Sequence, residues 1–438
     1  NEDGSVTTPD EFKPAYRQMV EAGYGAIPFD PDFGGGGFPW VSAIAIQEML
    51  TSANMAFSLW ALLTQGAIDA FTHLQGRGGP NARSRQYLLM GPWTHGGLFT
   101  NQNGALTYPL NAVRDPLDLL LPWYDATLRG DTAESDDWPP VRVYLMGAVG
   151  EAGAPGNEWI DLERWPPPAR PISFYLTAAG GLAKQAPQTG ELTLLSDPSD
   201  PVPTFGGANL HPGLIVDGRE MGDGPQDQRQ IEARSDVLTF TSDPLVKPAT
   251  VMGPVRAKIW LVPDTPDLDV AVRLSDVYPD GRSMLVLDGI QRARMRCGDD
   301  SECLLTPGVP VELTVELWST ALVFNGGHRI RVSVSGSNWP RFEVNPNDGA
   351  DLNLETDGVV ARPRLLFGGD HPSRVELPIP PQVRRPRART GPGGETVKSA
   401  SSKSTVVWGA DADSGRRIHS ALIGALRGPI VQPPDSPR

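Results

Sequence analysis

A repeated pattern of short strand-like runs between about residues 141 and 377 constrains this fold more than any other feature. The runs are rich in β-branched residues and are separated by segments with Pro, Gly and Asp, while the helical period is rare in this part. Strands that recur at such intervals predict an all-β sandwich or jelly roll. The expected strands are Val141–Met146, Ile172–Leu176, Val237–Phe240, Val255–Val262, Asp269–Val277, Val311–Leu317, Arg329–Val334 and Ser373–Leu377.

The first seventy or so residues show a helical pattern instead. The segment Thr8–Glu11 holds a capping box that begins a helix, and a second, helix-favouring run extends over Trp40–Leu74. Between them lie the four glycines Gly34–Gly37. No strand precedes these glycines and no Lys-Ser/Thr pair follows them, so we interpret them as a turn between helices and not as a phosphate loop.

Length and charge restrict the class of protein. A chain of 438 residues predicts two or three folded units, each with its own core. The formal net charge is −14 and no basic stripe precedes the tail, which argues against a nucleic-acid partner. No apolar run reaches the roughly 18 to 20 residues of a membrane helix, and no signal peptide is visible. We therefore expect a soluble, cytoplasmic protein with no membrane partner.

Two further features concern the cysteines and the tail. Cys297 and Cys303 lie in a polar loop, at a spacing that a hairpin disulfide can close and that no zinc site uses alone. Two free thiols are the expectation for a cytosolic protein. Beyond residue 378 the composition changes to Pro, Arg, Gly, Ser and Lys, so residues 379–438 are predicted to be mostly disordered.

A histidine motif follows an apolar strand-like run. The run Tyr87–Met90 is followed by Gly91-Pro-Trp-Thr-His95-Gly96. A strand that ends in Gly-Pro places the next residues on a loop at the carboxyl edge of the sheet, where α/β active sites gather. The motif resembles the catalytic-histidine motif of the cocaine esterase and X-prolyl dipeptidyl-peptidase family. The resemblance implies that His95 is a general base and that a small ester or peptide is the substrate.

The resemblance extends over about residues 71–378. It implies the last part of an α/β-hydrolase core followed by a galactose-binding-like jelly roll. The further matching segments are Trp123–Gly130, Pro140–Gly147, Trp165-Pro166, Phe174–Leu176, Gly180–Leu182, Thr241–Leu245, Gly253–Val255, Leu274–Gly281, Leu317-Trp318, Phe324, Gly327–Arg331, Ser335–Phe342 and Asn345–Asn347.

The sequence shows no motif for the other two members of a Ser-His-acid triad, the serine and the acid. The family's nucleophile lies in a Gly-x-Ser-x-Gly elbow before the histidine, and no such pentapeptide occurs in this sequence. Matching to the family places the triad acid at Ala61. Asp69 lies on a predicted helix, and Asp125 follows the histidine and matches a structural helix. We expect a capping or surface role for the first and a structural role for the second.

A different resemblance covers about residues 8–66. Its matching segments are Phe12–Arg17, Asp30–Gly34, Gln47–Met49, Ser52–Phe57 and Leu62–Gly66. They are similar to the N-terminal helical region of an acyl-CoA dehydrogenase. The FAD-contacting β-domain and the C-terminal bundle of that family have no counterpart, so we expect no flavin. The chain is interpreted as a fusion of two fragments that join near Gly66.

Other candidate residues have structural interpretations. His328 lies at a turn before a strand and is expected to be a structural histidine, and the remaining histidines show no metal-ligand spacing. Trp339, Arg341 and Phe342 are of types that line ligand grooves, but core and rim positions of the jelly roll are expected. No cofactor and no metal are predicted.

We therefore predict a multi-domain chain. Residues 1–70 form a helical fragment, 71–150 a remnant of an α/β-hydrolase core, 151–378 a jelly roll, and 379–438 a disordered tail. The leading functional hypothesis is a serine-hydrolase relative, of the ester- or X-prolyl-peptide-cleaving type, that is nearly inactive alone. The second is a non-catalytic β-sandwich that binds another chain or a carbohydrate-like ligand, and the third is an acyl-CoA dehydrogenase-like flavoprotein fragment. A truncated core exposes strand edges, so either a homo-oligomer or a partner chain is expected to cover it.

Overall fold

The computed structural model describes residues 67–78, 86–94, 97–126, 138–209, 213, 215–216, 218–298, 301–351 and 356–381. All of them belong to one compact unit, residues 1–385, and the second unit spans residues 386–438. Four predictions therefore lie outside the described residues: the N-terminal helical fragment as far as residue 66, the position of Ala61, the placement of His95, and the tail from residue 382.

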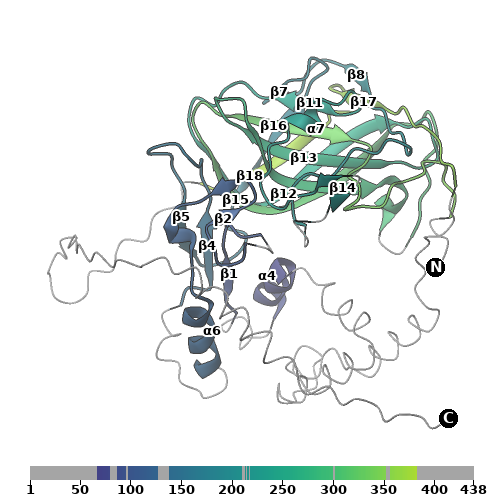
Figure 1. The fold of residues 1–438 in the computed structure, drawn as a ribbon. Coiled ribbons are helices and arrows are strands. Elements are labelled where there is room, and N and C mark those ends of the chain that lie inside the picture. Colours follow the sequence, from purple (N-terminus) through teal and green to yellow (C-terminus); the bar gives the residue numbers. More distant parts are fainter. Residues whose placement is uncertain are drawn as a thin grey trace, which may run out of the picture. The chain divides into compact units, whose positions relative to one another are not determined.

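Two antiparallel sheets form a β-sandwich that makes up most of the described chain (Figure 1). One sheet has the order β11-β16-β13-β14, and the other has the order β7-β6-β18-β12-β17-β8, with β15 paired to β12. In the first sheet the strands are β11 (Leu238–Thr241), β16 (Arg329–Ser335), β13 (Asp269–Val277) and β14 (Ser283–Arg292). In the second they are β6 (Arg170–Leu176), β7 (Leu182–Ala183), β8 (Gly190–Thr193), β12 (Ala249–Val262), β15 (Val311–Phe324), β17 (Arg364–Phe367) and β18 (Arg374–Ile379).

All eight strands predicted from the sequence are present, and the largest differences are at β12 and β15, which are six and seven residues longer than expected. The predicted strand begins at Val255, just after Pro254, whereas β12 passes through Pro254 with a shift in the register with β15 between Pro254 and Arg256. Such a bulge removes the need for a ladder hydrogen bond from proline. The sandwich strands β7, β8, β14 and β17 were not predicted. The β-sandwich is confirmed, and the jelly-roll connectivity remains a prediction.

One hydrophobic core fills the space between the two sheets. Alternate side chains of β13, such as Val270, Val272 and Leu274, are fully buried in it, and Val332 and Val334 of β16 lie on the same face. The opposite sheet contributes residues of β12, β15 and β18. Each fully buried aliphatic side chain stabilises the fold by about 1.5 to 3 kcal/mol, so this core dominates the stability of the described unit.

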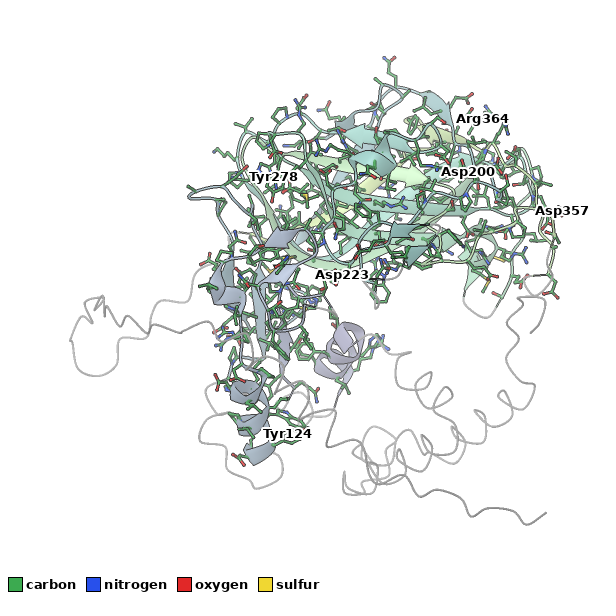
Figure 2. All side chains as sticks on the ribbon, in the orientation of Figure 1. Tyr124, Asp200, Asp223, Tyr278, Asp357 and Arg364 are labelled. Atoms are coloured by element: carbon green, nitrogen blue, oxygen red, sulfur yellow. A yellow bond between two sulfur atoms is a disulfide. The ribbon has the colours of Figure 1, made fainter. Side chains whose placement is uncertain are left out.

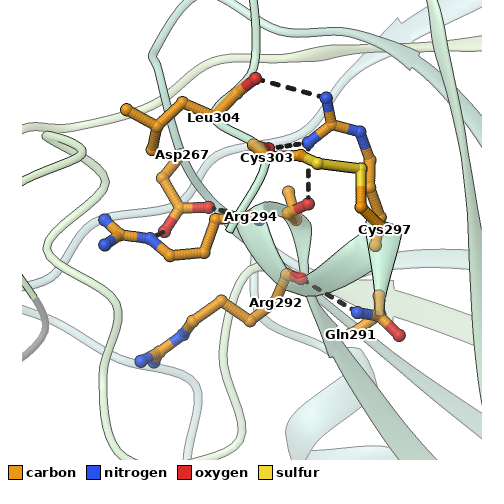
Figure 3. Close-up of a disulfide and its surroundings, with 9 residues drawn as sticks. Asp267, Gln291, Arg292, Arg294, Cys297, Cys303 and Leu304 are labelled. Atoms are coloured by element: carbon orange, nitrogen blue, oxygen red, sulfur yellow. Dashed lines mark hydrogen bonds and ion pairs between the residues drawn. A yellow bond between two sulfur atoms is a disulfide. The ribbon is translucent and has the colours of Figure 1, made fainter. Parts of the chain in front are cut away.

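A disulfide closes the loop that follows β14 (Figure 3). Cys297 and Cys303 are bonded, with their Cα atoms 6.1 Å apart. The expectation of two free thiols is therefore wrong, because the short 3-10 helix Ala293–Cys297 turns the chain back and brings the two cysteines within bonding range. The loop is also held by Arg294, which is fully buried and donates from Nε to Asp267 Oδ2 at 2.7 Å.

A smaller α/β part precedes the sandwich. In its sheet, β1 (Leu88–Met90) is parallel to β4 (Val141–Leu145), which is antiparallel to β5 (Glu158–Leu162). The helix α4 (Ala67–Arg77) places Phe71 in a buried cluster with Val141 and Val143. The remaining described elements are β2 (Gln102–Asn103), β3 (Leu106–Thr107), η2 (Leu110–Ala112), α6 (Pro116–Tyr124), β9 (Ile215–Val216), β10 (Arg219–Glu220) and α7 (Arg229–Glu232).

The α/β part and the sandwich share hydrogen bonds at the end of β4. The N–H of Met146 donates to the carbonyl oxygen of Ala321 at 2.9 Å, and the N–H of Val323 donates to the carbonyl oxygen of Met146 at 2.9 Å. The sheet of β1, β4 and β5 extends to Leu162, and the domain division near residue 150 stays a prediction. Within the described ranges, no helix is both long and apolar enough to cross a membrane.

Candidate active site

The candidate site is the loop between β1 and the β2–β3 hairpin, which we call the histidine loop (residues 91–100). It begins directly after Met90, at the carboxyl end of β1, as the sequence predicted. His95 and Gly96 lie outside the described residues, but both flanks of the loop are described. Parallel pairing of β1 with β4 makes this the edge at which α/β enzymes carry their catalytic loops.

Asn103 holds both sides of the histidine loop. Its Oδ1 accepts a hydrogen bond of 2.7 Å from the N–H of Thr94, the residue immediately before His95. The Oγ1 of Thr94 accepts a bond of 3.0 Å from the N–H of Gly97, which joins the two described flanks of the loop. Asn103 is only 1% exposed, and a side chain at position 97 would collide with its Oδ1. The buried amide therefore contacts both described flanks of the histidine loop, at Thr94 and at Gly97.

Trp93 anchors the same loop through an aromatic cluster. Its Nε1 donates to the carbonyl oxygen of Ala112 at 3.0 Å, and its ring lies 4.9 Å from Phe99 and 5.7 Å from Trp159. The guanidinium of Arg114 lies 4.6 Å from the centroid of Trp159. Burial, together with the positive charge of Arg142, lowers the pKa of Arg114. The cluster gives the loop a rigid, largely apolar support.

A segment of the sandwich contacts the histidine loop from the other side. The N–H of Ala105 in the hairpin donates to the carbonyl oxygen of Pro225 at 2.9 Å. Gly224 has a φ of +56°, and a side chain there would collide with Cγ2 of Thr94. The neighbouring Asp223 is buried on the side of the sandwich that faces β1 and α4 (Figure 2). The loop is therefore supported by residues from both parts of the chain.

These supporting residues were not found by sequence reasoning. Asn103 and Gly224 are separated by more than a hundred positions, and neither belongs to a motif. The single local signal was the glycine pair Gly96-Gly97 after the histidine, which indicates a close backbone approach. The partners in that approach are decided by tertiary contacts.

The two aspartates considered as substitutes for the triad acid lie on helices, as predicted. Asp69 falls within α4, and its side chain is not described. Asp125 caps the C-terminal end of α6 with helical backbone angles. Neither observation assigns a catalytic role to these residues. In the described part of the chain, no group of three or more His, Cys, Asp and Glu side chains is arranged to hold a metal ion.

His328 is a buried structural histidine, as predicted, with a carboxylate on each side. Its Nδ1 lies 2.9 Å from Oδ1 of Asp276, and its Nε2 lies 3.0 Å from Oε1 of Glu151. Burial alone lowers the pKa of His328, but the hydrogen bonds and charges of Asp276 and Glu151 outweigh it and raise the pKa above its ordinary value. A charged imidazolium can donate to both carboxylates at once, whereas a neutral ring donates to one.

A cavity of about 760 Å³ lies beside the cis Trp339-Pro340 peptide bond. Trp339, Phe205, Met221 and Ile231 contribute its apolar lining, and Arg234 lies at its polar side. The sequence allowed two interpretations of Trp339, a ligand groove and a core or rim position. In the structure its side chain lines this cavity.

Its sequence neighbour Arg341 has a different role. Its Nη1 lies 2.7 Å from Oδ1 and 2.6 Å from Oδ2 of Asp288, so it takes part in an internal ion pair. Close by, the guanidinium of Arg273 is fully buried, and this burial lowers its pKa to about 10. Arg341 therefore fits the core and rim position that was predicted.

Comparison with known proteins decides the family. Residues 133–376 match the family described as the X-Pro dipeptidyl-peptidase C-terminal non-catalytic domain. The chain belongs to the cocaine esterase and X-Pro dipeptidyl-peptidase family. Cocaine esterase of a Rhodococcus species is 33% identical over 345 residues, which are 73% of this chain and 56% of that protein. A solved α-amino acid ester hydrolase superposes with a TM-score of 0.61 at 28% identity, over 72% of this chain and 53% of that one.

The resemblance inferred from the histidine motif is thereby confirmed. The chain spans about half the length of the relatives that it matches. A match over 93 residues, 21% of this chain, is 38% identical to 3-methylmercaptopropionyl-CoA dehydrogenase of Ruegeria pomeroyi and covers 16% of that protein. This short match agrees with the predicted acyl-CoA dehydrogenase-like fragment, and the fusion itself stays a prediction.

We predict that Asn103→Ala loosens the histidine loop. The substitution removes the acceptor of the Thr94 N–H, and leaving a buried donor unsatisfied costs about 1 to 3 kcal/mol. Hydrogen exchange of peptides spanning residues 91–99 should become at least about tenfold faster. Asn101→Ala is the matched control, because Asn101 belongs to the same hairpin but donates to the carbonyl oxygen of Tyr108. Equal loop protection in the two variants would contradict the role of Asn103.

We also predict a pH-dependent contribution of His328 to stability. Its folded-state pKa lies above the ordinary value of about 6.5, so the contribution is complete below that pH and is lost as pH rises through the folded-state pKa. His328→Gln should lower the free energy of unfolding by about 3 kcal/mol at pH 6 and by less at pH 9. Urea unfolding at both pH values measures this. His371→Gln, at a ring packed on Trp260, is the control, and a loss that is independent of pH would refute the charged imidazole.

Proposed function

We propose that this chain provides the histidine-bearing half of a serine hydrolase that cleaves small esters or X-prolyl peptides. In this proposal His95 is the general base, and the chain alone turns over little or no substrate, because it lacks a recognisable nucleophile elbow. The observation that best supports this proposal is the position of the histidine loop. It lies at the carboxyl end of β1 and is held by Asn103 on one side and by the sandwich on the other.

The chemistry of such a site sets what each part has to do. An imidazole takes the proton of a serine hydroxyl while that oxygen attacks the carbonyl carbon, and then gives the proton to the leaving group. This transfer needs the ring within hydrogen-bond reach of the serine, so the loop backbone has to be fixed to a fraction of an ångström. The buried Asn103 and the Trp93 cluster are suited to that task. A serine and an acid would have to come from elsewhere.

The test is hydrolysis of a p-nitrophenyl short-chain ester and of a chromogenic X-Pro dipeptide by the full chain. We expect no turnover above the buffer rate, and the same result for His95→Ala. Turnover that His95→Ala abolishes would show that an unrecognised nucleophile completes the site within this chain. It would contradict the inactive-alone part of the proposal. Turnover that survives His95→Ala would contradict the role of the histidine.

A second candidate function is a ligand-binding role of the sandwich, favoured by the cavity beside Trp339. Its aromatic and apolar lining, with polar groups at the side, is suited to stacking against a sugar ring. Quenching of tryptophan fluorescence by a series of soluble oligosaccharides tests this. Trp339→Ala should weaken binding at least tenfold, while Trp318→Ala, at an exposed tryptophan outside the cavity, should not. Absence of saturable quenching, or equal loss in both variants, would exclude the carbohydrate-like ligand.

A further inference from the structure

His328 links the sandwich to the α/β part through its side chain. It directly precedes β16, and it is fully buried. Its Nδ1 faces Asp276 of β13 at 2.9 Å, and its Nε2 faces Glu151 at 3.0 Å. Glu151 lies in residues 146–157, which connect β4 to β5 and which we call the connecting segment. The imidazole ring therefore joins the connecting segment to the sandwich.

The number of protons on the ring decides how many of these contacts are favourable. A charged imidazolium donates to both carboxylates. A neutral ring donates from one nitrogen and turns the lone pair of the other nitrogen toward the second carboxylate. Two like charges then face each other across a neutral ring, which is unfavourable where little water is present. Loss of the proton therefore breaks one of the two contacts.

Burial decides which of the two contacts breaks. The side chain of Asp276 is 4% exposed, and β13 is an inner strand between β14 and β16. The side chain of Glu151 is 29% exposed and lies outside the regular strands. A carboxylate without a partner has to reach water, and Glu151 can do so more readily than Asp276. The neutral ring therefore keeps its bond to Asp276 and releases Glu151.

Two further bonds join the connecting segment to the sandwich. Asn325 donates from Nδ2 to Oε2 of Glu151 at 2.7 Å. The N–H of Val149 donates to the hydroxyl of Tyr278 at 3.1 Å. Of the three contacts, the one with His328 is where a positive charge can meet the carboxylate, and such bonds are stronger than those from neutral donors. Loss of the ring proton therefore weakens this attachment and leaves the chain folded.

The other charged and titratable groups around the ring are Asp276, Glu151, Tyr278 and Arg282. The ring of Tyr278 lies 4.4 Å from that of His328, and the guanidinium of Arg282 lies 4.4 Å from the centroid of Tyr278 (Figure 2). Burial raises the pKa of Tyr278 to about 12, so its hydroxyl stays neutral up to pH 9.5. The imidazole is the member of this set whose ordinary pKa lies nearest to neutral pH.

The connecting segment leads to the aromatic support of the histidine loop. At its end, the carbonyl oxygen of Asn157 accepts a bond of 2.8 Å from Nδ2 of Asn111. The carbonyl oxygen of Asn111 accepts a bond of 2.7 Å from Nε1 of Trp159. The ring of Trp159 lies 5.7 Å from that of Trp93 in the histidine loop. A change in the connecting segment therefore acts on the cluster that anchors Trp93.

We propose that His328 is a pH-operated latch, whose protonated ring fastens the connecting segment to the sandwich and steadies the histidine loop, and whose deprotonation loosens both. Burial alone lowers the pKa of His328, but Asp276 and Glu151 raise it above its ordinary value. The latch is therefore closed below about pH 6.5 and opens as pH rises through the folded-state pKa. It does not depend on the chemical role of His95.

The experiment is electron paramagnetic resonance of the full chain with a nitroxide label at a single introduced cysteine. The two native cysteines are bonded to each other, so a label can be placed by Ala152→Cys, Leu98→Cys or Val246→Cys. From pH 6 to pH 9.5, we expect the rotational correlation time of the label at position 152 to fall at least about twofold. The label at position 98 should respond with the same midpoint. Position 246, which is 95% exposed on the sandwich, should not respond.

Three variants identify the titrating group. Glu151→Gln should abolish the response at position 152, because an amide can either accept from or donate to Nε2 of the ring. His328→Gln should make this label mobile already at pH 6. His371→Gln, at a histidine packed on Trp260, is the matched control and should keep the response. Circular dichroism verifies that each variant is folded.

A label at position 152 that keeps its mobility from pH 6 to pH 9.5 would overturn the latch. So would an equal response at position 246, or a response that Glu151→Gln leaves unchanged. A response at position 152 without one at position 98 would overturn the coupling to the histidine loop. Responses at both positions that Glu151→Gln abolishes and His371→Gln retains support the latch and its coupling.

Discussion

The long antiparallel pairing of β12 with β15 is the interaction on which the rest of this structure depends. The pairing extends from Ala249 and Phe324 at one end to Leu261 and Val311 at the other. It supplies inward side chains to the main core and also borders the cluster around Phe71, through Met252 and Val323. Because Met146 bonds to the β15 backbone, the α/β part is aligned on this pair. The position of the histidine loop relative to the sandwich follows from that alignment.

Charged groups inside the sandwich are paired where the chain has to change direction. Asp267 and Arg294 hold the loop closed by the disulfide, and His328 between Asp276 and Glu151 holds the start of β16 against the segment after β4. Removing one member of such a set leaves an uncompensated buried charge, which costs more than the intact pair contributes. The buried ions therefore act mainly by specifying one arrangement of the loops around a core that apolar residues already stabilise.

The candidate site combines a well-supported loop with an incomplete catalytic set. Asn103 and the Gly224 segment contact the histidine loop, and Trp93 within the loop bonds to Ala112. Support of this kind agrees with the proposed role of His95 as a general base, because proton transfer depends on fixed geometry. The sequence holds no Gly-x-Ser-x-Gly elbow.

The sequence by itself determined the β-sandwich, the positions of most of its strands, the strand before the histidine and the family. These depend on local properties, namely β-branched runs between Pro and Gly and a histidine motif of high specificity. It did not determine β14, the extension of β12 through Pro254, the disulfide or the residues that support the histidine loop. A bulge in the register with β15 accommodates Pro254, and the contact of Gly224 with Thr94 joins positions far apart in the chain. Only the tertiary structure decided these features, because each depends on which distant backbone lies within a few ångströms.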